Sequence, residues 1–253
     1  MIVYPRYILP TENWARVANG CTITATSEKV PDYEAVRAGN DDPAWPWWAD
    51  ATSATLTCTF AETSDVDAVA IIHSNADVGA NITVDGVSGG PYAITGAKGA
   101  GGYPKNLVAY TPGGSGSSVT IAIAGNTYDF SIGEVVAGPL HTGAFTFEPN
   151  TERERTRNVI DDQNPDFNHT IRYDRGGENF TLRTSSSMSD AAYEELKELW
   201  EITRGGVLPL LVIPYGGAEP VLVRMEPAFK VAKNKLWRSS YVFVELARGK
   251  MTQ

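Results

Sequence analysis

The sequence predicts a mainly β protein with two units: an N-terminal β-sandwich of the jelly-roll kind, and a C-terminal β-barrel or α+β unit with one helix. Short runs rich in Val, Ile and Thr recur at roughly 8–12-residue spacing in the first half. Only one helical pattern occurs, in the second half. Residues 1–137 carry 6 Lys and Arg against 14 Asp and Glu, whereas residues 138–253 carry 15 against 16. The Gly138-Pro139 breaker pair therefore separates residues 1–137 from 138–253.

The first unit is predicted to contain seven short strands. Its most informative stretch is Asp65–Asn75, where an apolar run with little alternation indicates a strand that is covered on both faces. Polar residues then end this strand. The glycine-rich stretch 88–106 is predicted to form one or two long exposed loops. The predicted strands are Cys21–Thr26, Ala54–Phe60, Ala68–His73, Asn81–Val84, Leu107–Tyr110, Ser118–Ala124 and Thr127–Ile132.

The second unit is predicted to combine one helix with strands on both sides of it. Ser189 is a suitable N-cap, and Gly205-Gly206 provides the stop. Tyr193, Leu196, Trp200 and Thr203 share one face, which we expect to pack on a sheet. The predicted strands are Gly143–Phe147, Thr170–Arg175, Glu178–Thr184, Leu208–Ile213, Val221–Met225 and Arg238–Leu246.

Residues 148–169 form a polar segment with charges of both signs. A solvated hairpin or flexible loop explains this composition, and an interaction arm that reaches a neighbouring subunit is the alternative. As an assembly loop, the segment would act through the charged residues Arg153, Arg155, Arg157, Asp161 and Asp162.

Composition excludes several function classes. The net charge of −9, with no cluster of Lys and Arg, argues against nucleic-acid binding, which needs a concentrated basic face. No apolar run approaches the ~20 residues of a membrane span, and we expect neither a signal peptide nor an anchor. Cys21 and Cys58 lie in strand-like segments and are expected to be buried thiols, which suits a reducing cytoplasm.

No motif predicts catalysis, a metal or a cofactor. The three histidines, His73, His141 and His169, are widely separated and have no ligand-like spacing. No nucleophile turn of the GxSxG type is present. Adjacent acids such as Asp41-Asp42 and Asp161-Asp162 resemble the carboxylate pairs of glycosidases, but neighbours on one loop rarely face each other as those do. We therefore expect a protein that is not an enzyme.

The tryptophan-rich segment 41–50 has the composition of a sugar-binding surface. Aromatic faces stack on sugar rings, and carboxylates accept hydrogen bonds from hydroxyl groups. The alternative is that the tryptophans fill the core beneath a loop and that the strand tip anchors loop backbone. The candidate ligand-binding residues are Trp45, Trp47 and Trp48, the acids Asp41 and Asp42, and His73 and Asn75 at the strand tip.

Three stretches carry a resemblance to known proteins: NWARVANGCTITATS, PWWADATSATLTCTF and DVDAVAIIHSN. Together they resemble the galactose-binding-like jelly roll of discoidin-type modules and of minor tail proteins of long-tailed bacteriophages. The connector DFSIGEVVAGPL, the single helix and the terminal WRSSYVFVEL resemble a tail-tube or distal-tail unit. Ser74 stands between His73 and Asn75, where the family pattern has none.

The resemblance implies a structural virion component of the tail tip or baseplate, assembled in the host cytoplasm. Its second unit would join a homo-oligomeric ring, threefold or sixfold, around the tail axis, with other tail-tip proteins and the tail tube as partners. The jelly roll would be displayed outward. The alternative function is a carbohydrate-binding module for host-surface glycan, and the two functions are compatible.

Overall fold

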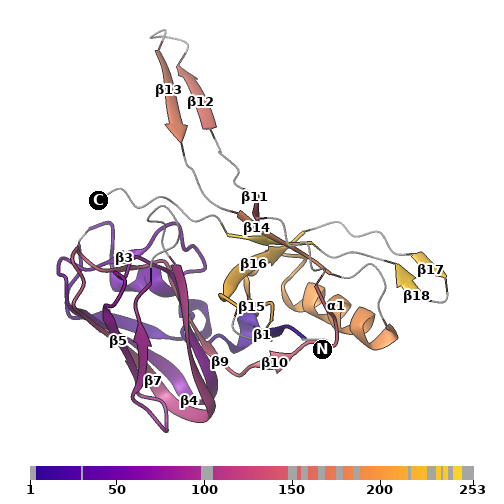
Figure 1. Ribbon diagram of the computed structural model, residues 1–253, viewed down its shortest axis with the longest axis horizontal. Coiled ribbons are helices and arrows are strands. Elements are labelled where there is room, and N and C mark those ends of the chain that lie inside the picture. Colours follow the sequence, from indigo (N-terminus) through magenta and orange to yellow (C-terminus); the bar gives the residue numbers. More distant parts are fainter. Residues whose placement is uncertain are drawn as a thin grey trace.

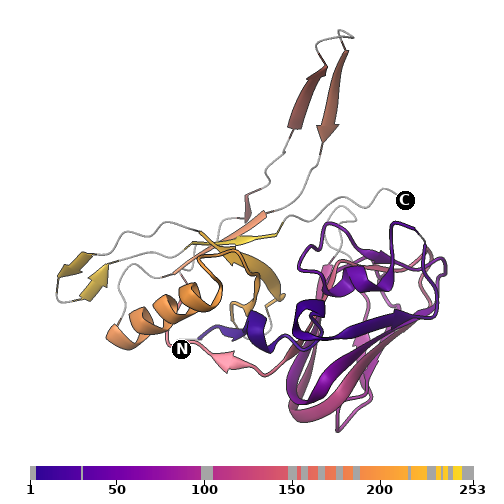
Figure 2. The ribbon, with the colours of Figure 1, turned by 180° about the vertical axis from the view of Figure 1, so that it is seen from behind.

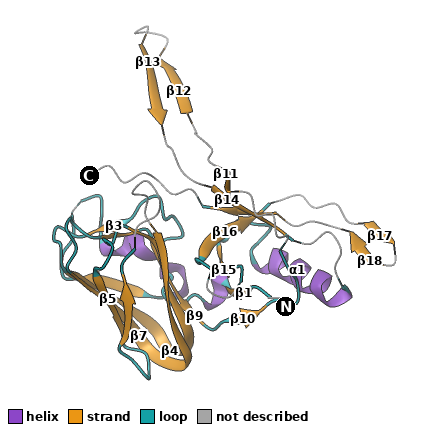
Figure 3. Ribbon diagram, in the orientation of Figure 1, coloured by secondary structure: helices purple, strands orange, loops and turns teal. Residues whose placement is uncertain are grey.

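The computed structural model shows two β units side by side, with a helix against the second (Figure 1). The mainly β fold that the sequence predicts is confirmed, and the described residues contain one α-helix. Figure 3 shows how strands dominate both units. The structure describes residues 4–29, 31–97, 105–147, 153–154, 159–164, 169–174, 179–184, 189–215, 218–226, 232–234, 236–238 and 242–246.

The first unit is built on two long antiparallel strands, β4 (Ala54–Ser74) and β7 (Lys105–Ala124). These two strands pair with each other in a sheet of order β2-β4-β7-β5-β6, and β9 pairs with the last part of β4. A separate pair, β3-β8, lies over the core. The other bounds are β2 (Thr22–Ala25), β3 (Trp47–Trp48), β5 (Asn81–Asp85), β6 (Tyr92–Thr95), β8 (Ser131–Ile132) and β9 (Glu134–Gly138), with 3₁₀ turns η1 (Pro10–Glu12), η2 (Val17–Asn19) and η3 (Ala35–Gly39).

Two sequence predictions need correction in this unit. Each long strand joins two strands that were predicted separately, because register shifts between Thr59 and Ser64 and between Val66 and Ala68 bend β4 without ending it. The stretch 88–106 is not loop throughout, since β6 pairs with β5 at Tyr92–Thr95. The sequence did not indicate β6 because its four residues are only partly buried and lie between glycine-rich stretches.

The second unit is an open antiparallel sheet in the order β10-β1-β15-β16-β19-β14-β11, so the described residues form no closed barrel. One of its strands, β1, comes from the N-terminal end of the chain and pairs with β10 and β15. The chain therefore crosses between the units twice. The bounds are β1 (Arg6–Ile8), β10 (His141–Thr142), β11 (Arg153–Glu154), β14 (Asn179–Arg183), β15 (Leu210–Ile213), β16 (Val221–Met225) and β19 (Val242–Glu245).

The helix α1 (Asp190–Ile202) begins at its predicted N-cap, but the predicted glycine stop comes only after Arg204, which has a φ of 52° and is the first left-handed residue beyond the helix. Ser189 Oγ accepts a hydrogen bond from the backbone N–H of Ala192 at 3.2 Å. At the other end, Gly206 has a φ of 84°, and a Cβ there would lie 1.9 Å from the carbonyl oxygen of Met225. The face toward the sheet is rotated slightly from the predicted one, since Tyr193 and Trp200 are only half-buried. Its buried residues are Ala192, Leu196, Leu199 and Thr203.

A shared core joins the two units. Along β4, Val69 and Ile71 enter the sandwich core, whereas Ala70 and Ile72 point to the second unit. Strands β15 and β16 alternate in the same way between the helix side and the sandwich side. The absence of alternation in Asp65–Asn75 thus has the predicted cause, a cover on both faces. We call this shared core the joint: Ile8, Ala68, Ala70, Ile72, Val136, Leu211 and Leu222.

Polar contacts reinforce the joint next to the strand tip. Asn106 accepts a hydrogen bond from the backbone N–H of His73 at 2.8 Å and donates from Nδ2 to the carbonyl of Pro220 at 2.8 Å. Its own backbone N–H donates to Glu219 Oε1 at 2.9 Å. One buried side chain therefore connects the end of β4 to the second unit.

Two hairpins extend from the second unit (Figures 1 and 2). The first consists of β12 (Val159–Asn164) and β13 (His169–Asp174), and the second of β17 (Ala232–Asn234) and β18 (Leu236–Arg238). Within the described part of the chain, each hairpin is a two-stranded sheet of its own. Of the two forms expected for the polar segment, hairpin or loop, the structure shows a hairpin at Val159–Asn164, whose partner strand His169–Asp174 lies almost entirely beyond the predicted segment.

Candidate functional site

An open pocket of about 320 Å³ lies between the sandwich and the second unit. The segment that follows η3 forms one side of it, and β16 and the residue after β19 form the other. This segment is the first part of the predicted sugar-binding stretch. Its lining residues are Asn40, Asp41, Asp42, Pro43, Ala44, Arg224 and Leu246.

Asp41 is held in place by an arginine of its own unit. Arg16 donates from Nε at 2.8 Å and from Nη2 at 2.5 Å to the Asp41 carboxylate, and both side chains are mostly buried. Such a fork of two hydrogen bonds fixes the carboxylate geometrically as well as neutralising its charge. Asp41 also has a φ of 65°, so the backbone turns sharply at this point. Asp41 therefore shapes the pocket, while its charge is already satisfied.

Asp42 and Arg224 offer the pocket charges of opposite sign. Asp42 is exposed, and its Oδ1 accepts a hydrogen bond from the backbone N–H of Ala44 at 3.2 Å, while its Oδ2 accepts none from the described residues. Arg224 is the exposed residue of otherwise buried β16, and its guanidinium forms no ion pair with the described residues. An acceptor and a forked donor thus face the same space, an arrangement that can bind neighbouring hydroxyl groups.

Trp45 is the one tryptophan of the predicted set that is largely exposed, at 53%. It follows Ala44, a lining residue, so it stands beside the pocket rather than inside it. The guanidinium carbon of Arg37 lies 5.6 Å from the centre of its ring. This cation–π contact orients the indole and leaves much of its surface in water.

Trp47 and Trp48 have structural contacts instead. Trp47 is fully buried, meets the Phe130 ring edge to face at 5.8 Å, and donates from Nε1 to the carbonyl of Ser27 at 3.2 Å. Trp48 is half-buried against the Tyr33 ring, with Lys29 Nζ 4.9 Å from its centre. In this structure Trp47 belongs to the core, the alternative that the sequence left open.

His73 and Asn75 lie away from the pocket lining and anchor backbone. His73 is buried, with a φ of 54° and its N–H bonded to Asn106. Asn75 donates from Nδ2 to the carbonyl of Asp129 at 2.8 Å and accepts from the N–H of Ser131 at 2.9 Å. The structure thus places Asp41 and Asp42 in the pocket lining, with Trp45 next in the chain to the lining residue Ala44, and it places Trp47, Trp48, His73 and Asn75 elsewhere.

The predicted assembly residues are divided between two strands. Arg153 lies in β11, at the edge of the large sheet, and Asp161 and Asp162 lie in β12 of the extended hairpin. Arg155 and Arg157 lie outside the described residues.

Sequence reasoning missed Arg224 and Arg37. Arg224 lies about 180 positions from Asp42 in the chain, and only the fold brings the two together. A charged residue inside the apolar run VLVRM was the available signal, since the rest of β16 is buried. Among the described residues, no group of three or more His, Cys, Asp and Glu could hold a metal ion, and no helix is long and apolar enough to cross a membrane.

Comparisons with known proteins relate the chain to solved structures alone, because neither a protein-family model nor a curated protein matches it. A chitosan-binding module from Paenibacillus sp. IK-5 is 20% identical, with a TM-score of 0.40 over 51% of this chain and 98% of that one. A family 32 carbohydrate-binding module from Clostridium perfringens, in complex with galactose, is 17% identical, with a TM-score of 0.39 over 54% and 99%. Another C. perfringens module, in complex with GalNAc-β-1,3-galactose, is 12% identical, with a TM-score of 0.38 over 51% and 99%.

Proposed function

We propose that the chain is a non-catalytic glycan-binding protein and that its site is the pocket beside Trp45. The observation that carries the proposal is the exposed carboxylate of Asp42 and the exposed guanidinium of Arg224 at one open pocket, with the exposed indole of Trp45 next in the chain to the lining residue Ala44. Sugars are bound by an aromatic face for their C–H groups and a few placed polar groups for their hydroxyls. The names of the similar solved modules fit this function better than a tail-tip role.

The pocket also has a suitable size. At about 320 Å³ it is at the small end of ligand sites, which suits one or two sugar rings rather than a long chain. Because Asp41 is already neutralised by Arg16, the ligand meets one open carboxylate and one open guanidinium, at Asp42 and Arg224. Neutral hydroxyl-bearing sugars therefore suit the site best.

Replacing Trp45 with alanine should weaken glycan binding by about 10-fold or more without lowering stability, because a stacked aromatic contributes on the order of 1.4 kcal/mol to affinity. The measurement is the apparent affinity of the full chain for an immobilised panel that includes chitosan and galactose-, GalNAc- and fucose-terminated glycans. Tyr128→Ala, which removes another exposed aromatic of the sandwich, is the matched control. Equal binding by the Trp45 variant and the wild type would remove this site from consideration.

A second function, assembly into a larger structure, is favoured by the extended hairpin β12-β13. A two-stranded hairpin on its own is marginally stable in water, and its two free edges can pair with other strands. Pairing with a strand of a neighbouring subunit would stabilise the hairpin and cover its edges. Together with the resemblance to distal-tail and minor tail proteins, this supports a threefold or sixfold ring in a phage tail tip, with the sandwich displayed outward.

Shortening the hairpin should abolish such assembly and leave each subunit folded. Glu154 and Asn179 are directly opposite in β11 and β14, so an Asn-Gly turn can replace residues 155–178 without disturbing the large sheet. We expect light scattering to give a discrete oligomer for the full chain and a monomer for the shortened one. A monomeric wild type, or an oligomer of unchanged mass after shortening, would contradict the assembly function.

A further inference from the structure

Glu134 is a buried acidic residue next to the joint. It begins β9, pairs with Ile72 of β4, and is 1% exposed. Neither of its carboxylate oxygens has a hydrogen-bond partner. A buried ionised group without partners costs several kcal/mol, so such positions are usually occupied by apolar residues or by bonded acids. Glu134 therefore needs an explanation that packing alone does not give.

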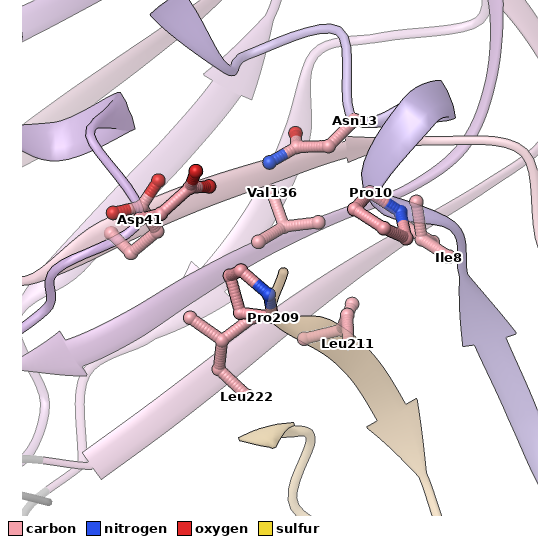
Figure 4. A pocket seen from close by; sticks show the side chains of 9 residues that line it. Ile8, Pro10, Asn13, Asp41, Val136, Pro209, Leu211 and Leu222 are labelled. Atoms are coloured by element: carbon pink, nitrogen blue, oxygen red, sulfur yellow. The ribbon is translucent and has the colours of Figure 1, made fainter. Parts of the chain in front are cut away.

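The surroundings of Glu134 disfavour its charged form. It lines a small cavity of about 10 Å³ between the two units, at the lower limit for one water molecule (Figure 4). Asp41 lines the same cavity and brings a second carboxylate. From the second unit the cavity receives only uncharged side chains, those of Ile8, Pro209, Leu211 and Leu222. A carboxylate formed here would have room for at most one water molecule and no cation of its own.

The charged and titratable groups around Glu134 come from three parts of the sandwich. Burial raises the pKa of Glu134 well above its usual value, and the Asp41 carboxylate raises it further. The backbone N–H of Asp41, which forms no hydrogen bond of normal geometry with Glu134, and the guanidinium of Arg16 act in the opposite direction, but Arg16 is already engaged by Asp41. The facing groups are Asp41 and Asp42 after η3, Arg16 before η2, and the thiol of Cys58 on β4.

We propose that Glu134 makes the joint pH-responsive: the neutral acid holds the two units together, and its ionisation loosens them. The neutral carboxyl fits the apolar cavity and can donate a proton to a neighbouring oxygen. The carboxylate must instead reach water, which requires the segment bearing Asp41 to separate from Leu211 and Leu222. Because Asp41 also lines the open pocket, loosening would reshape that site as well.

The direction of the pH effect follows from linkage. The pKa of Glu134 is higher in the folded chain than in the unfolded one, so its contribution is fully present below about pH 4.3, the usual glutamate pKa. That contribution is lost as pH rises toward the folded pKa. Rising pH therefore favours opening of the joint.

The test compares full-length wild type with Glu134→Gln, which retains the neutral shape of the protonated acid. We expect the Tm of the wild type to fall by about 3 °C or more between pH 5 and pH 9 relative to Glu134→Gln. Glu62→Gln, which removes an exposed carboxylate of β4, is the control and should follow the wild type. Parallel Tm curves for the wild type and Glu134→Gln would overturn the proposal.

Two further readouts separate the joint from global unfolding. Hydrogen exchange at Asn106, whose contacts lie next to the joint, should accelerate with pH relative to Ile121, in the sandwich core, and the ratio cancels the intrinsic pH dependence of exchange. In wild type with ¹³C-labelled glutamate carboxyls, one carboxyl signal should titrate at a higher pH than the other glutamates. Its midpoint should equal the midpoint of the change in the exchange ratio. This readout needs only the wild type, so it remains available if Glu134→Gln fails to fold. A constant exchange ratio, or glutamates that all titrate near pH 4–5, would contradict the proposal.

Discussion

Replacing Trp47 with alanine is expected to lower the free energy of unfolding by about 3–5 kcal/mol, the usual cost of removing a large buried aromatic. Trp47 is fully enclosed in the sandwich core. The substitution would remove its edge-to-face contact with Phe130 and its hydrogen bond to Ser27, and it would leave a cavity in the sandwich core. Urea or guanidinium unfolding at constant pH measures the difference.

Trp45→Ala is the matched control for this change, because it removes the same side chain two positions earlier from a largely exposed site. We expect its free energy of unfolding to stay within about 0.5 kcal/mol of the wild type, as at most exposed positions. The pair therefore separates the two roles that the sequence could not distinguish. Equal losses for both variants, or a loss below ~1 kcal/mol for Trp47→Ala, would show that the core is assigned wrongly.

Replacing Leu211 with alanine should cost about 2–5 kcal/mol and weaken the coupling of the two units. Leu211 is 1% exposed and meets the sandwich from the opposite face of β15 to Leu210 and Val212, which enter the helix-side core. The second unit therefore keeps its own core when Leu211 is truncated. Thermal unfolding measures the effect. We expect one cooperative transition for the wild type and two separate transitions for the variant.

Val207→Ala provides the comparison for Leu211→Ala, since Val207 is 63% exposed and lies just before β15. It should unfold like the wild type. If Leu211→Ala loses less than ~1 kcal/mol, the buried contact between the units is not stabilising, and the joint would have to be assigned to the polar contacts of Asn106 alone.

Much of the fold was predictable because strand periodicity records which faces are covered. The apolar run Ala68–Ile72 within Asp65–Asn75 indicated cover on both faces, and the structure shows the sandwich core on one side and the joint on the other. The bends of β4 were not predictable, since register shifts leave no clear sequence signal. The N-terminal strand β1 was missed because three residues are too short a pattern to interpret.

The site was only partly predictable from the sequence. The cluster of tryptophans and acids indicated the right segment, but composition cannot tell which of Trp45 and Trp47 faces water. Arg224 comes from a distant strand, so no spacing rule could have found it. Glu134 was overlooked although it interrupts an apolar run, because a single charge in a strand is ordinarily a solvent-facing residue.

The most direct test of the account is an NMR titration of the six tryptophan indole N–H signals with a glycan from the binding panel. Assignment by Trp45→Phe and Trp47→Phe identifies the two signals that matter. The account predicts a saturable shift of the Trp45 signal and an unchanged Trp47 signal. Failure of every panel glycan to shift Trp45, or a glycan that binds and leaves Trp45 unchanged, would contradict a glycan site at this pocket.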